Sequence, residues 1–208
     1  MRPLHLSVTA LSAAALLLSA TPATAAPRAE GTTDRVAAAG ASADGFETPL
    51  VPAPYTFTDY LGGQPMGPWT VGGDSVDLTN DRLWDAAEGH QSLDLNGSTS
   101  GSVSRKISTL PLTSYIVSFK LAGNPEWLPA LKTGELRVNS SPLKTFSFDI
   151  TGHGRRSMGY VQQTAVFTTL LNTSVTLTFV STNPGYGGPV IDDVKIQSCL
   201  LVLCPPHH

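Results

Sequence analysis

The stretch Tyr115-Ile116-Val117-Ser118-Phe119-Lys120-Leu121 alternates with a period of two, which is the spacing of a β-strand. Tyr115, Val117, Phe119 and Leu121 fall on one face, and Ser118 and Lys120 fall on the other. The same alternation recurs over residues 145–150 and 175–179. One apolar and one polar face is typical of half-buried strands in an antiparallel sheet.

Gly and Pro punctuate the segments between these runs, as at Leu61-Gly62-Gly63 and Asn183-Pro184-Gly185. No amphipathic helix of three turns is evident. About nine to eleven short strands joined by tight turns favour an all-β fold, an antiparallel two-sheet jelly-roll sandwich.

The chain divides into four predicted parts. Residues 1–25 have a basic start, an apolar stretch and the small-residue site Ala23-Thr24-Ala25, which indicates a signal peptide and a secreted protein. Residues 26–44 are rich in Ala, Thr, Gly and Ser and are predicted to be a flexible linker. Residues 45–198 form the sandwich, and 199–208 form a cysteine-containing tail. No apolar run is long enough to predict a membrane span.

Charge argues against a nucleic-acid partner, because the formal net charge is -3 and phosphate binding needs clustered Lys and Arg. The dense charge cluster is acidic, and Arg82 is its one opposing residue. Its acids are Asp74, Asp77, Asp81, Asp85, Glu88 and Asp94. This cluster would repel phosphates and attract cations.

Cys199 and Cys204 both lie in the tail. In an oxidising compartment the simplest prediction is that they pair with each other, with intermolecular pairing as the alternative. Loop closure this short stabilises a fold by only about 2 kcal/mol. His207 and His208 leave weak metal capture open as a third use of the tail.

Acidic residues also mark both ends of the predicted sandwich, in Gly45-Phe46-Glu47 and Ile191-Asp192-Asp193-Val194. In an antiparallel sandwich the first and last strands often lie side by side, so Glu47 is predicted to face Asp192 or Asp193. Carboxylates gathered in this way suit a structural calcium ion, which takes six to eight oxygen ligands. The alternative is that all three acids point into solvent.

Catalytic motifs are not evident. The sequence has no Gly-x-Ser-x-Gly elbow, no His-Glu-x-x-His motif and no zinc-type spacing of Cys and His. An aspartate pair in the acidic stretch, including Asp77 or Asp85, would be required for a glycoside hydrolase. We therefore predict a non-catalytic protein.

The tryptophans Trp69, Trp84 and Trp127 lie in Gly-, Pro- or charge-rich segments rather than in alternating strands. An indole in a loop can stack on the C–H face of a sugar, while polar neighbours bind the hydroxyls. The alternative is that each Trp caps the core. The predicted ligand-binding residues are Trp84, Trp127, Asp85, His90, Gln91 and Asn124.

Seven separated motifs between Gly45 and Ile196 carry a family resemblance, among them Gly45-Phe46-Glu47-Thr48-Pro49, Ser92-Leu93-Asp94-Leu95-Asn96-Gly97 and Gly188-Pro189-Val190-Ile191-Asp192-Asp193-Val194. This region resembles the choice-of-anchor C domain, which is related to a plant cell-wall family of unknown function with galactose-binding-like domains. The resemblance implies an extracellular, non-catalytic jelly roll associated with wall polysaccharide. The terminal acids are also similar to those of xylan- and glucan-binding modules, which implies that Glu47 and Asp193, with Asp192, hold a structural calcium ion.

The leading hypothesis is a secreted module that binds a cell-wall or extracellular polysaccharide and is stabilised by calcium. A surface or matrix protein that mediates protein contacts is the second hypothesis. A hydrolase with a hidden carboxylate pair is the third.

Overall fold

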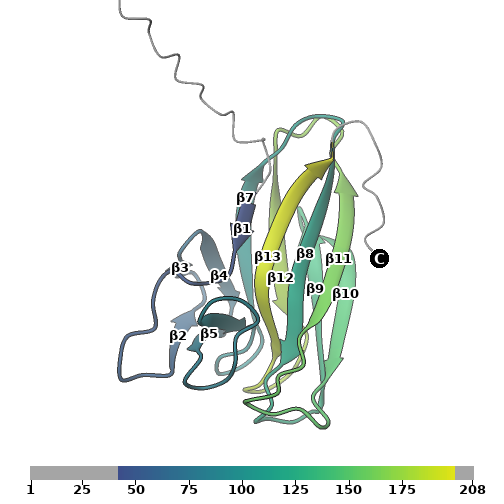
Figure 1. The fold of residues 1–208 in the computed structure, drawn as a ribbon. Coiled ribbons are helices and arrows are strands. Elements are labelled where there is room, and N and C mark those ends of the chain that lie inside the picture. Colours follow the sequence, from purple (N-terminus) through teal and green to yellow (C-terminus); the bar gives the residue numbers. More distant parts are fainter. Residues whose placement is uncertain (1–41, 200–208) are drawn as a thin grey trace, which may run out of the picture. The chain divides into compact units, whose positions relative to one another are not determined.

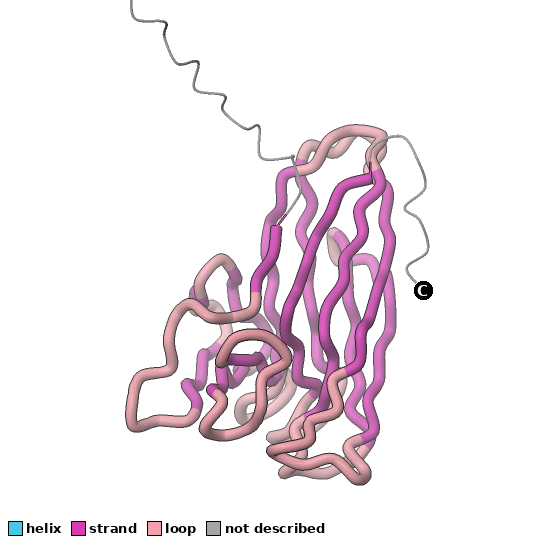
Figure 2. The backbone as a smooth tube through the Cα atoms, in the orientation of Figure 1, coloured by secondary structure: helices cyan, strands magenta, loops and turns pink. Residues whose placement is uncertain are grey.

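The computed structural model describes residues 42–199, which contain thirteen β-strands and no helix (Figure 2). The predicted signal peptide, most of the predicted linker and residues 200–208 lie outside this range. Residues 42–44, which the sequence assigns to the linker, form the first strand, so the sheet begins three residues before the predicted start at Gly45.

The strands form two antiparallel sheets, as predicted, and Figure 1 shows the long strands of each sheet running side by side. Sheet A has the order β11-β8-β13-β6-β5-β2, and β1 also pairs with β13. Its strands are β1 (Ser42–Asp44), β2 (Phe57–Leu61), β5 (Ser75–Asn80), β6 (Gln91–Asp94), β8 (Ser114–Gly123), β11 (Val161–Thr168) and β13 (Pro189–Cys199).

Sheet B has the order β10-β9-β12-β7-β4-β3. Its strands are β3 (Pro65–Met66), β4 (Trp69–Gly73), β7 (Gly101–Ser108), β9 (Leu131–Val138), β10 (Ser141–Asp149) and β12 (Ser174–Ser181). The described strands exceed the nine to eleven expected because short strands such as β1 and β3 have too few residues to show a period.

The core lies between the sheets and contains the predicted inward residues of β8, β10 and β12. Phe119 of β8 is fully buried and meets Phe146 and Phe179 of sheet B edge to face, with ring centroids 5.4 and 5.0 Å apart. Such aromatic pairs add roughly 1 kcal/mol each beyond the area they bury. The alternation in the sequence therefore decides which face of each strand meets the other sheet.

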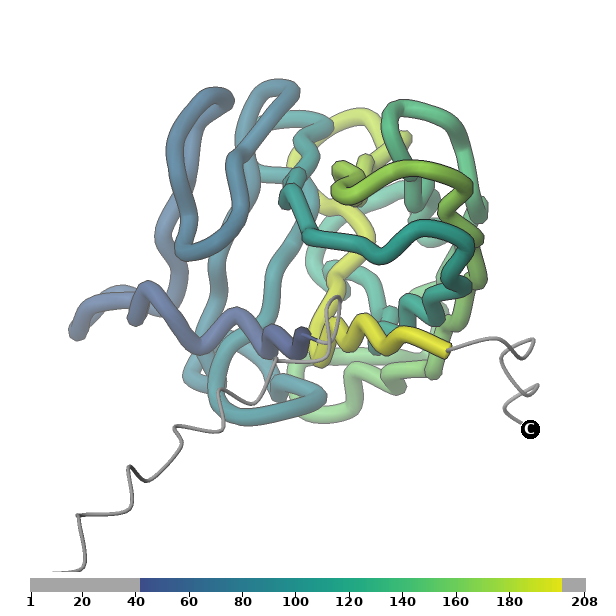
Figure 3. Tube along the Cα trace, turned by 90° about the horizontal axis from the view of Figure 1, so that it is seen from above, coloured from purple at the N-terminus to yellow at the C-terminus, as the bar shows by residue number. Residues whose placement is uncertain are grey.

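The first and last strands are neighbours, as predicted. Asp44 of β1 pairs with Val194 of β13, and Figure 3 shows the purple start of the described chain beside the yellow β13. The ladder between β13 and β8 shifts register between Asp192 and Lys195, and Asp193 has a φ of 47°. This bulge interrupts the strand where the two aspartates lie.

The described part of the chain contains no helix of the length and hydrophobicity that crossing a bilayer requires.

Candidate functional site

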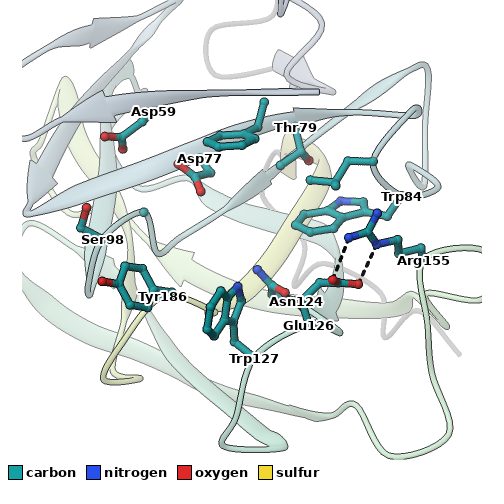
Figure 4. A pocket seen from close by; sticks show the side chains of 13 residues that line it. Asp59, Asp77, Thr79, Trp84, Ser98, Asn124, Glu126, Trp127, Arg155 and Tyr186 are labelled. Carbon is teal, nitrogen blue, oxygen red and sulfur yellow. Dashed lines mark hydrogen bonds and ion pairs between the residues drawn. The ribbon is translucent and has the colours of Figure 1, made fainter. Parts of the chain in front are cut away.

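A cleft of about 500 Å³ lies over the outer face of sheet A at its β2–β5 edge (Figure 4). Val76 and Leu78 of β5 point into the core, so Asp77 and Thr79 point out of the sandwich. Asp59 of β2 is directly opposite Asp77, and both carboxyl groups line the cleft. The floor of the cleft is therefore acidic and belongs to two paired strands.

Exposed aromatic side chains form part of the walls. Trp127, in the loop after β8, is 52% exposed, and Tyr186, in the loop before β13, is 57% exposed. Their ring centroids lie 5.2 Å apart with the planes tilted by 39°, and Figure 4 shows the two rings side by side. Phe57 of β2 lines the cleft and is 47% exposed. Aromatic surface that is left uncovered at a concave site is typical of ligand binding.

An ion pair closes another part of the rim. Arg155 donates from Nε and from a terminal nitrogen to the two carboxylate oxygens of Glu126, both at 2.7 Å. This bidentate pair joins the loop after β8 to the loop before β11. The two charges neutralise each other, so neither is left free to attract a charged ligand.

The carboxyl group of Asp77 holds a proton near neutral pH. Burial, followed by the charges of Asp94 and Asp59 and a hydrogen bond to Asp59, raises the pKa of Asp77 to about 8. The Asp77 carboxyl can then donate to Asp59. The remaining oxygen atoms of the pair are acceptors for groups in the cleft.

Asp94 supports the floor from β6, where it is opposite Asp77 in the sheet. Its fully buried carboxylate accepts from the backbone N–H of Asn96 and Gly188 and from the side-chain amide of Asn124, at 2.7 to 3.0 Å. Burial raises the pKa of Asp94 to about 7, while these hydrogen bonds and the charge of Lys132 lower it. Asp94 thereby fixes two of the loops that surround the cleft.

Lys132 fixes the aromatic wall. Its buried ammonium donates to the carbonyl oxygens of Trp127 and Gly187, at 2.6 and 2.8 Å. Burial lowers the pKa of Lys132, and the charge of Asp94 opposes that shift. The loops that carry Trp127 and Tyr186 are thus bonded to one side chain.

The structure brings together three of the six predicted ligand-binding residues, since Trp127, Asn124 and Trp84 line the cleft. Trp84, however, is only 2% exposed, and its indole N–H donates to the Ser92 hydroxyl at 2.9 Å. Most of the Trp84 side chain therefore packs in the core, which agrees with the alternative interpretation that this tryptophan caps the core. Asn124 uses its amide on Asp94 and contributes an edge to the cleft.

The other three predicted ligand residues do not line this cleft. Asp85 pairs with Arg156 at 2.9 Å, and the His90 ring nitrogen lies 2.6 Å from an Asp81 carboxylate oxygen. Gln91 is buried and donates to the carbonyls of Phe46 and Pro49. These three residues are close to Trp84 in the sequence, but they do not share the cleft that Trp84 lines.

The predicted metal ligands Glu47 and Asp192 are far apart in the sequence, but both bind the same loop. Glu47 accepts the N–H groups of His90 and Gln91, both at 2.8 Å. Asp192 accepts those of Ala87 and Glu88, at 2.7 and 2.9 Å. Both acids therefore hold residues 87–91, which lead into β6, against the sandwich.

The fit of this place to calcium is partial. Asp193 instead pairs with Lys195 at 2.8 Å, and residues 42–199 hold no group of three or more acidic, His or Cys side chains suited to a metal. The Glu88 carboxylate does lie close to Asp192, because a Cβ on Gly45 would collide with Glu88 and lie 3.8 Å from Asp192 Oδ1. Burial raises the pKa of Asp192 to about 7, with a smaller contribution from Glu88. Calcium stays a prediction, and it would need backbone carbonyl ligands.

The predicted disulfide also stays a prediction. Cys199 ends β13, and Cys204 lies beyond the described residues, as do His207 and His208.

Sequence reasoning missed Asp59, Phe57 and Tyr186. The sequence did hold a signal for Phe57 and Asp59. These residues are two apart in a strand and therefore share a face, and the apolar residues of that strand do not alternate cleanly. Tyr186 follows a Pro-Gly turn, and nothing in the local sequence links it to Trp127.

The family profile described as "Protein of unknown function (DUF642)" matches residues 42–197, which is nearly all of the described domain. The chain belongs to the DUF642 family. The match begins at the first residue of β1 and ends within β13, so the family corresponds to the whole sandwich. No curated protein is a significant sequence match to this DUF642 chain.

Solved structures with a similar fold include a family 35 carbohydrate-binding module from Clostridium thermocellum, with 15% identity, a TM-score of 0.48, and coverage of 68% of this chain and 99% of that chain. Another is the family 22 xylan-binding domain from Paenibacillus barcinonensis, with 14% identity, a TM-score of 0.47, and coverage of 68% and 92%. They resemble this DUF642 domain in the architecture of the sandwich.

Proposed function

We propose that this DUF642 domain is a non-catalytic glycan-binding module that acts outside the cell, and that the cleft beside Trp127 and Tyr186 is its binding site. The supporting observation is that two exposed, mutually packed aromatic rings share a cleft with carboxyl and amide groups. Aromatic faces stack on the C–H face of a pyranose, and short polar side chains bind its hydroxyls.

Export is part of the proposal and rests on the N-terminal signal pattern in the sequence. The narrower assignment to the choice-of-anchor C domain rests on the motifs alone. A shallow site that uses stacking and a few hydrogen bonds binds with roughly micromolar to millimolar affinity.

The aromatic wall gives the direct test. Trp127→Ala removes the exposed ring, and we expect at least a tenfold loss of affinity in a glycan array followed by titration calorimetry, by the usual weight of a buried aromatic at an interface. Tyr55→Ala is the matched control, because Tyr55 is 64% exposed and lies outside the cleft. Trp84→Ala is unsuitable, since loss of a buried indole destabilises the fold.

Two results would refute the proposal. One is the absence of binding to any glycan by the folded protein. The other is binding that Trp127→Ala and Tyr55→Ala leave equally unchanged.

The hydrolase hypothesis is less well supported than binding. Asp59 and Asp77 are cross-strand partners that share a hydrogen bond, whereas glycosidase carboxyl pairs stand about 5 to 9 Å apart. Release of reducing sugar by the pure protein, lost in Asp77→Asn, would revive that hypothesis.

A role in protein contacts has one observation in its favour. Leu112, Leu170 and Leu171 are 68%, 68% and 82% exposed, and the first two are joined by a backbone hydrogen bond of 2.9 Å. Leu112 precedes β8, and Leu170 and Leu171 follow β11, whose last residue pairs with the first residue of β8. All three leucines are therefore at the opposite end of β8 from Asn124 and Trp127. Light scattering of Leu112→Ser beside the parent would test whether this end joins copies or partners.

A further inference from the structure

The charge inside the cleft is unbalanced. Four charged side chains line it, and Glu126 and Arg155 cancel each other through two 2.7 Å hydrogen bonds. Asp59 and Asp77 remain, and no basic side chain other than Arg155 lines the described cleft. A ligand in the cleft therefore meets a net negative floor.

The groups that face this acid pair from neighbouring elements do not neutralise it. Asp94, on β6, adds a further carboxyl beside Asp77. The Lys132 ammonium, from β9, is occupied by the carbonyls of Trp127 and Gly187 and acts on Asp94. Asn124 donates to Asp94 and carries no charge.

The aromatic walls strengthen the effect. Phe57, Trp84, Trp127 and Tyr186 line the cleft with apolar surface, and a local dielectric below that of bulk water increases the energy between like charges. A carboxylate on a bound sugar would approach the pair without a counter-charge. An uncharged sugar can instead donate its hydroxyl groups to the acceptor oxygens of the two carboxyl groups.

Building on the proposed glycan-binding function, we infer that the cleft selects uncharged polysaccharides and rejects those that carry carboxylates, such as polyuronates. The selection comes from Asp59 and Asp77, while Trp127 and Tyr186 supply stacking that neutral and acidic sugars share. Stacking and charge selection are thus assigned to different residues.

Matched oligosaccharides test this assignment. The neutral probes are cellohexaose, xylohexaose and β-1,4-galactohexaose. The acidic probes are hexagalacturonate and cellohexaose oxidised at C6 to the uronate, which keeps the backbone of its neutral counterpart. Titrations at pH 7 in low salt should give a dissociation constant at least about tenfold higher for the acidic probes than for the best neutral one.

The double variant Asp59→Asn with Asp77→Asn removes the charge and keeps the shape. We expect the ratio between acidic and neutral probes to fall toward one. Asp59→Asn alone should give part of that change and serves if the double variant folds poorly, whereas Asp77, with a pKa of about 8, is already mostly uncharged at pH 7. Asp85→Asn, an acid outside the cleft, is the matched control and should leave the ratio unchanged.

The outcomes separate the two proposals. If a probe binds in a manner that depends on Trp127 but acidic probes bind as tightly as neutral ones, the charge selection is wrong and glycan binding stands. If the double variant leaves the ratio unchanged, the assignment to Asp59 and Asp77 is wrong. If no probe binds, both proposals are overturned.

Discussion

Two sets of acids in this domain have the same chemistry and opposite surroundings. Glu47 and Asp192 accept backbone N–H groups of the segment between β5 and β6. Asp59 and Asp77 instead face an open cleft and each other. Carboxylates bonded to backbone donors are part of the architecture, whereas carboxyl groups at a cleft are available to a ligand. The partner, and not the residue type, separates structure from function.

The largest expected effect is the loss of a structural acid. Asp192→Ala leaves the N–H groups of Ala87 and Glu88 without their acceptor, and we expect a loss of about 3 kcal/mol in the free energy of unfolding. Urea titration measures it. Asp85→Ala, in the same loop, breaks only a surface ion pair and should cost less than about 1 kcal/mol. Equal losses would erase the distinction between the two sets.

The next effect has the opposite sign, because a cleft acid costs stability at high pH. The folded pKa of Asp77 is about 8, above the usual aspartate value of 3.8, so the folded state holds a proton that the unfolded state releases. The stability from that proton is complete below about pH 4 and is lost as pH rises through about 8. Asp94 and Asp192 have raised pKa values of about 7, so they also contribute stability that is lost as pH rises.

Asp77→Asn removes this titration. At pH 8 we expect its melting temperature to exceed that of the parent by several degrees, which corresponds to roughly 2 kcal/mol in the free energy of unfolding. The gain should be smaller at pH 5. Calorimetry at the two pH values measures the difference. Asp149→Asn is the control, because hydrogen bonds from Thr151 lower the pKa of Asp149 and its removal should give no gain at pH 8.

Calcium would sharpen the comparison by adding a ligand to the structural acids. If calcium binds there, a chelator should lower the melting temperature. The corresponding loss in the free energy of unfolding is about 1.4 kcal/mol when free calcium is ten times the dissociation constant. Glu47→Ala should melt at the same temperature with and without chelator. A parent protein that is insensitive to chelation would remove calcium from the proposal.

The smallest effect is expected at the rim of the cleft. Arg155→Ala breaks the pair with Glu126, but both side chains are partly exposed, at 51% and 37%, so stability should change by less than about 1 kcal/mol. A melting curve of this variant checks it. A larger loss would mean that the rim contributes to the fold as much as the contacts of residues 87–91 do.

The sequence predicted the sandwich because alternation is a local property. Phe119, Phe146 and Leu177 each show their burial within a few neighbours, and all three are in the core. The pairing of the first and last strands was also predicted, because these strands often lie side by side in an antiparallel sandwich.

The cleft could not be predicted because it depends on register and on contacts distant in sequence. Asp59 meets Asp77 only in one register, and a slip of one residue would turn Asp77 into the core. Trp127 meets Tyr186 across two separate loops. His90 and Gln91 do not line this cleft, because the His90 ring lies beside Asp81 and the Gln91 amide donates to the carbonyls of Phe46 and Pro49.

The buried ammonium of Lys132 has a consequence for how a ligand would be received. Because Lys132 bonds the carbonyls behind both aromatic loops, the two rings are held in place by the folded chain itself. The two loops are then ordered before a ligand binds, so the entropy lost on binding is mainly that of the sugar chain. Backbone order parameters at Trp127 and Tyr186 would be the same with and without bound oligosaccharide.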